Sequence, residues 1–95
     1  MKPPHPGETI KEDYLVPLGM SVNRLAAALG IGAARLNEIV RGKRGITADT
    51  ALRLARCFGT SAEFWLNLQS LYDLRMAERK VRGRIEREVT PLKVA

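Results

Sequence analysis

The stretch LAAALGIGAARLNEIVRG, from Leu25 to Gly42, constrains the fold of this chain more than any other segment. It holds two apolar patterns at helical spacing, and Gly30 interrupts them. Two short helices that cross at a wide angle need a sharp corner, where glycine tolerates the positive φ that the corner requires. Close packing before the corner needs a small residue, and Ala26 lies one helical turn earlier. This spacing is typical of a DNA-binding helix-turn-helix.

The residues expected on the inner side of the motif are all bulky or branched and apolar. They are Leu25, Leu29, Ile31, Leu36 and Ile39. An ordinary helical hairpin with a glycine turn is the competing interpretation of this pattern. The helix-turn-helix is favoured because one helix is predicted before the motif and two after it, in a basic chain of 95 residues.

Capping residues give the bounds of five predicted helices. Proline suits the first helical position, Ser and Thr suit N-caps, and glycine suits the residue after the C-terminus. Thr60 and Glu63 together read as a capping box. The predicted helices run from Pro6 to about Pro17, from Ser21 to Gly30, from Ala33 to Arg41, from Thr47 to Gly59 and from Thr60 to about Arg82.

The predicted fold class is therefore all-α: a five-helix, repressor-like helix-turn-helix domain with a short C-terminal extension. The domain covers residues 1–82, with the helix-turn-helix at about 21–41, and the extension covers 83–95. Past Gly83, apolar and charged residues alternate around Ile85 to Val89, which fits either one short strand or a disordered tail. Short helices are marginally stable alone, so tertiary packing must hold them.

Composition narrows the class of function. The net charge of +6 favours a polyanionic partner, with nucleic acid as the leading candidate. No apolar run approaches the ~18 residues of a membrane span. Cys57 has no second cysteine to pair with, which fits a reducing cytoplasm. The sequence has one histidine, His5, and one cysteine, which cannot build a structural zinc site within a single chain. We expect no metal, no cofactor and no catalytic residues.

The predicted recognition helix begins with small residues that allow close approach to base edges in the major groove. Polar residues further along would form hydrogen bonds, such as the bidentate pair of Asn37 with adenine. The candidates for base contact are Gly32, Ala33, Ala34, Arg35, Asn37, Glu38 and Arg41, and those for the DNA backbone are Asn23, Arg24, Lys43 and Arg44. For each charged residue, a solvated surface position is the alternative.

A helix-turn-helix of this size reads about half an operator, so we expect a two-fold dimer on a palindrome. The longest helix is the expected interface, with Trp65 and Leu68 closing the monomer core. The candidate interface residues are Leu71, Leu74 and Met76. We expect His5 to cap the first helix, and Cys57 to be a half-buried structural thiol.

Three segments carry a family resemblance: HPGE at residues 5–8, the helix-turn-helix, and GITADTALRLARCFGTSAEFWLNLQSLYDL at residues 45–74. With them, the chain resembles the HigA-type antitoxins of the phage-repressor-like (XRE) helix-turn-helix family. The resemblance implies a cytoplasmic bacterial protein that binds a HigB-like, RelE-type ribonuclease toxin and represses its own operon. It departs from many phage repressors at Val22, where they carry a DNA-contacting glutamine.

Two other functions remain open from the sequence. One is a stand-alone helix-turn-helix regulator without a toxin partner. The other is a protein-interaction module whose helix-turn-helix no longer binds DNA.

Overall fold

The computed structural model describes residues 3–93, in which every regular element is helical. The elements are α1 (Pro6–Thr9), a π-helical turn (Ile10–Leu15), α2 (Val16–Leu18), α3 (Val22–Leu29), α4 (Ala33–Val40), α5 (Ala48–Phe58) and α6 (Ala62–Glu88). The first three follow one another without a break and together form the first predicted helix. The prediction of an all-α fold with five helices is therefore confirmed.

Capping explains most of the helix bounds. Pro6 occupies the first turn of α1, and Gly19, Gly30 and Gly59 follow helix ends in the left-handed region with φ of 60 to 74°. The hydroxyls of Ser21 and Thr47 accept from the N–H groups of Arg24 and Thr50, as N-caps do. These predictions of helix ends are confirmed.

The predicted capping box before α6 is wrong by one residue. Ser61 is the N-cap, and its Oγ accepts from the N–H of Phe64 at 3.1 Å. The hydroxyl of Thr60 instead accepts from the Trp65 indole N–H at 2.7 Å. That contact satisfies the one polar atom of a fully buried side chain, which explains why Thr60 does not cap the helix.

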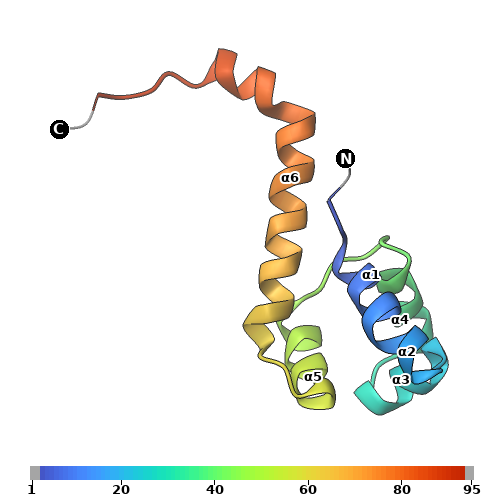
Figure 1. The fold of residues 1–95 in the computed structure, drawn as a ribbon. Helices are drawn as coiled ribbons and strands as arrows, with labels where there is room; N and C mark the ends of the chain where they lie inside the picture. Colours follow the sequence, from blue (N-terminus) through green and yellow to red (C-terminus); the bar gives the residue numbers. More distant parts are fainter. Residues whose placement is uncertain (1–2, 94–95) are drawn as a thin grey trace.

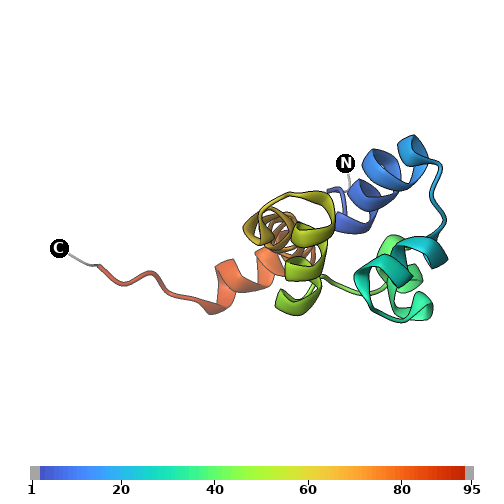
Figure 2. The ribbon, with the colours of Figure 1, turned by 90° about the horizontal axis from the view of Figure 1, so that it is seen from below.

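Helix α6 extends further than predicted. It runs through Gly83 to Glu88, so the expectation of a strand around Ile85–Val89 is wrong. Ion pairs one turn apart, Glu78 with Arg82 and Arg84 with Glu88, support the helix on both sides of the glycine. The distal part of α6 projects away from the other helices, which gather on one side of it (Figures 1 and 2).

A single apolar core joins the helices. Its fully buried members are Ile10, Leu25, Leu36, Ile39, Ala51, Leu54 and Trp65. Tyr14 stacks on Phe58 with ring centroids 3.9 Å apart, and both rings lie beside Trp65. The expectation that Trp65 closes the monomer core is confirmed, and Leu68 is partly buried against the same cluster.

Candidate nucleic-acid interface

The corner between α3 and α4 has the geometry that the sequence predicted. Gly30 has a φ of 72°, in the left-handed region. The N–H of Ile31 donates to the carbonyl of Ala26 at 3.1 Å, and that of Gly30 donates to Ala27 at 3.2 Å. Ala26 is buried under the turn, where a larger side chain would hold the two helices apart. The corner therefore fixes the direction in which α4 leaves α3.

Helix α4 has one buried face and one exposed face. Leu36 and Ile39 are fully buried, whereas Ala34, Asn37 and Arg41 are exposed to solvent. Gly32 is the N-cap without a side-chain cap, and a Cβ placed on it would meet no atom within 4 Å. The first turn of α4 is therefore narrow and open, as entry into a major groove requires.

The loop after α4 is held on both sides. Gly42 has a φ of 76°, and the N–H of Lys43 donates to the Glu38 carbonyl at 2.8 Å, which closes the end of α4. Further on, the N–H of Ile46 donates to Oε1 of Gln69 on α6 at 2.7 Å. The side chains of Lys43 and Arg44 stay exposed on this anchored loop.

The segment before the helix-turn-helix packs against the backbone of α4. A Cβ on Gly7 would lie 1.9 Å from the carbonyl oxygen of Ile39, so α1 packs on the α4 backbone at a distance only glycine allows. His5 caps α1 through Nδ1, which accepts from the Gly7 N–H at 2.9 Å. Its ring and that of Tyr72 form a T-shaped pair with centroids 4.8 Å apart. The predicted capping role of His5 is confirmed, and its burial joins α1 to α6 beside α4.

The start of α3 provides further polar groups. Asn23 and Arg24 are exposed in its first turn, beside the Ser21 cap. Val22 packs partly against the core, so the position that carries glutamine in many phage repressors here contributes packing.

Three predicted contact residues, Glu38, Arg44 and Arg35, have partners within the chain. Nη2 of Arg44 lies 3.4 Å from Oε2 of Glu38, so the two opposite charges partly neutralise each other at the end of α4. Nη2 of Arg35 donates to Oγ1 of Thr50 at 2.6 Å, and it lies 4.0 Å from Oδ1 of Asp49. Arg35 therefore lies against the first turn of α5. Its partners are 12 to 15 residues away in the sequence, where local patterns give no signal.

The exposed large apolar residues of α6 lie on a single face. Phe64, Leu71, Leu74 and Ile85 are 40 to 54% exposed, and their spacing aligns them on a helix with 3.6 residues per turn. Met76 points to a different face and is partly buried. We call the set Phe64, Leu71, Leu74 and Ile85 the α6 apolar face.

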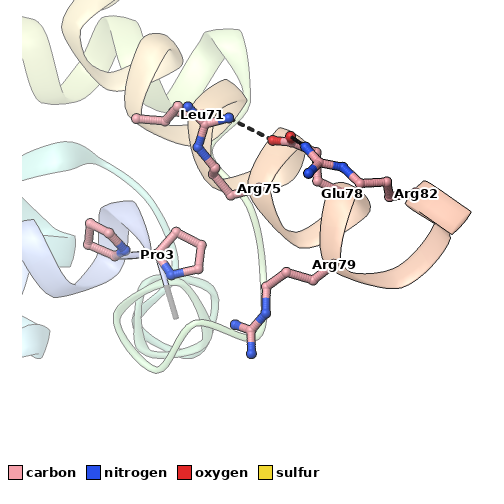
Figure 3. Close-up of a pocket in the computed structure, with 7 residues that line it drawn as sticks. Pro3, Leu71, Arg75, Glu78, Arg79 and Arg82 are labelled. Carbon is pink, nitrogen blue, oxygen red and sulfur yellow. Dashed lines mark hydrogen bonds and ion pairs between the residues drawn. The ribbon is translucent and has the colours of Figure 1, made fainter. Parts of the chain in front are cut away.

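A groove of about 530 Å³ runs between α6 and the N-terminal segment (Figure 3). Pro3 and Pro4 form one side, and Leu71 lies on the other with charged residues of α6. Among them, Glu78 accepts hydrogen bonds from Arg75 and Arg82. The hydrogen bond from Arg75 holds the pKa of Glu78 below its ordinary value.

Two further observations concern residues outside the motif. Cys57 is exposed, so the expectation of a half-buried thiol is wrong. It lies on the outer side of α5 near Arg53 and Arg56, away from the core. Within residues 3–93, no helix is both long enough and apolar enough to cross a membrane.

Comparisons with known proteins agree with this geometry. The helix-turn-helix family matches residues 10–65. Virulence-associated protein I of Dichelobacter nodosus is 60% identical over 75 residues, which are 79% of this chain and 69% of that protein.

Solved structures extend the likeness over almost the whole chain. An addiction module antidote protein of the HigA family from Coxiella burnetii has a TM-score of 0.92 and 53% identity, over 97% of this chain and all of that one. The Pseudomonas aeruginosa antitoxin HigA, solved with the higBA promoter, has a TM-score of 0.92 and 47% identity, over 96% and 99% of the two chains. This chain therefore belongs to the helix-turn-helix family and, within it, to the HigA-type antitoxins.

Proposed function

We propose that this protein is a dimeric antitoxin that represses its own operon through α4 and neutralises a RelE-type ribonuclease toxin by direct binding. The observation that carries the proposal is the open, exposed face of α4 on a helix-turn-helix whose fold matches HigA structures over nearly its full length. One of those structures was solved with the higBA promoter, which supports operator binding by this chain. Operator binding takes place in the bacterial cytoplasm.

The first turn of α4 enters the major groove, and residues of its exposed face read the bases. Asn37 pairs with adenine through its amide, and an alanine methyl contacts a thymine methyl. Glu38 accepts from a cytosine amine once Arg44 has moved to a phosphate. The residues proposed near base edges are Gly32, Ala33, Ala34, Asn37, Glu38 and Arg41.

Phosphate contacts fix the protein on the duplex without reading its sequence. Arg24 and Asn23 lie in the first turn of α3, and Lys43 and Arg44 lie on the anchored loop after α4. These two groups flank the recognition helix in sequence on both sides. We propose that they hold the backbone on either side of the groove.

The α6 apolar face supports the proposal of a dimer. It leaves four large apolar side chains exposed on one side of the longest helix, and monomeric proteins rarely leave such a surface uncovered. Leu71 and Leu74 lie within this face, as predicted for the interface. Met76 lies on another side of α6, so a partner that covers both leucines reaches it only by wrapping around the helix.

The toxin partner is proposed from the family alone, and no residue here is assigned to its surface. A toxin gene next to the gene for this chain would separate an antitoxin from a stand-alone regulator. The division into a domain (1–82) and an extension (83–95) stays a prediction, and α6 crosses that boundary without a break.

Two experiments test the proposed function. In the first, the DNA upstream of the gene is mixed with the protein in a gel-shift titration at low salt, with a scrambled duplex as the control. We expect preferential binding of the upstream DNA, and an unshifted band would favour a protein-interaction module. In the second, the chain is co-expressed with the adjacent open reading frame. Co-purification with relief of growth arrest is expected, and a harmless, unbound neighbour would favour the stand-alone regulator.

A further inference from the structure

We propose that Arg35 is a positioning residue, which fixes α4 on α5, and that it does not read a base. Together with Thr50, Asp49 and Arg53 of α5 it forms a polar network that sets the angle between the two helices of the motif. This inference rests on the proposed operator binding, since it concerns how the recognition helix is held.

The guanidinium of Arg35 is hydrogen-bonded to α5. Nη2 donates to Oγ1 of Thr50 at 2.6 Å, and a second hydroxyl, Oγ1 of Thr47, lies 3.4 Å away. Thr50 is fully buried with Arg35 in this position. To reach a base, Arg35 would have to leave this hydroxyl, and the lost charge-assisted hydrogen bond would offset the gain at the base.

Arg53 holds the other helix of the motif from the same side. Its Nη1 donates to the carbonyl of Leu29 at 2.9 Å and to that of Gly30 at 3.3 Å. The last carbonyls of a helix lack partners within it, so Arg53 satisfies the C-terminal end of α3. Arg53 is thus bound to the corner itself.

Asp49 joins the two arginines. Oδ1 accepts from Nε of Arg53 at 2.8 Å, and the same oxygen lies 4.0 Å from Nη2 of Arg35. One carboxylate in the first turn of α5 therefore connects the end of α3 to the start of α4. Functional groups keep their geometry when surrounding hydrogen bonds fix the element that carries them. Without this network, α4 would keep its sequence but would meet the groove at a less defined angle.

The test is a double-mutant cycle with Arg35→Met and Thr50→Val, read by the Kd for the operator duplex at fixed salt. Each single variant is expected to raise Kd by roughly tenfold, the size of one lost hydrogen bond to a charged group, and the double variant no more than either single. Arg35→Met is also expected to weaken binding by the same factor on every operator with one base pair changed.

Direct base reading by Arg35 gives a different result. Thr50→Val would then leave Kd unchanged, because Thr50 is buried, and Arg35→Met would abolish the preference at one base pair. That result overturns the proposal. Asp49→Asn, at a more exposed position, provides a variant with little risk to the fold and is expected to raise Kd as well.

Thr60→Val is the matched control. It removes a threonine hydroxyl that accepts from Trp65 at the start of α6, so it lowers stability without touching α4. Its Kd is expected to equal that of the wild type. If the wild type binds no operator, the proposed function fails and not the network. The network is then tested by thermal unfolding, in which the losses of stability caused by Arg35→Met and Thr50→Val are expected to be non-additive.

Discussion

Gly7→Ala is expected to destabilise the protein strongly, because α1 lies against the α4 backbone at this residue. The added Cβ would lie 1.9 Å from the carbonyl oxygen of Ile39 and 3.0 Å from Cα of Val40. Both are backbone atoms, so neither can rotate away, and α1 as a whole must shift. Overpacking of this kind costs about 3 kcal/mol, against about 1 kcal/mol gained from the helix propensity of alanine.

The net loss of about 2 kcal/mol corresponds to a fall in Tm of about 8 to 16 °C for a domain of this size. Thermal unfolding followed by circular dichroism measures it. Gly83→Ala is the contrast, since its Cβ would meet only the end of the Arg87 side chain at 3.5 Å, and its Tm is expected not to fall. A shift in Tm of 2 °C corresponds to a change of about 0.5 kcal/mol in the free energy of unfolding. A Tm for Gly7→Ala within 2 °C of that of the wild type would therefore refute the close packing of α1 on α4.

Three further predictions concern charge and assembly. Lys43→Ala in both subunits of a dimer should reduce the slope of the logarithm of the DNA-binding constant against log salt by about 1.8, or 0.9 for each phosphate contact. Lys80→Ala on α6 is the control and should leave the slope unchanged. Equal slopes for the wild type and both variants would argue against phosphate binding by Lys43. Leu74→Glu should convert the dimer to a monomer in light scattering, because it places a charge in the centre of the α6 apolar face, and an unchanged mass would place the interface elsewhere. The pKa of Glu78 is lowered beside Arg75, so its ionised form stabilises the fold above the unfolded pKa, and this contribution is lost as pH falls through the lower, folded pKa. Glu78→Gln should therefore be less stable than the wild type at pH 7, and the difference should shrink as pH falls below the ordinary value of 4.5 and vanish below the folded pKa. A difference in stability that is independent of pH would contradict this prediction.

Much of the fold could be predicted because its signals are local. The caps at Ser21 and Thr47 and the glycines after α3 and α5 each determine a helix end within a few residues. The inner face of the motif also follows from spacing alone, and Leu36 and Ile39 are buried as expected.

The errors arose where a distant or competing partner decides the outcome. Thr60 binds the Trp65 indole instead of capping α6. The contact of Arg35 with Thr50 of α5 likewise joins residues 15 apart in the sequence, so the pattern on α4 gave no sign of it. Beyond Gly83, the same residues fit a period of two and a period of 3.6, and the pairing of Arg84 with Glu88 favours the helix. The dimer and toxin surfaces depend on other chains, about which one sequence carries little information.

The affinity of Asn37→Ala for operator DNA tests the central claim, that the exposed face of α4 reads the major groove. Its Kd is measured by competition at fixed salt against the operator and a scrambled duplex of equal length. We predict a rise in Kd of about 5- to 150-fold for the operator, which corresponds to about 1 to 3 kcal/mol for a lost bidentate contact, and no change for the scrambled duplex. An operator preference equal to that of the wild type would contradict the account.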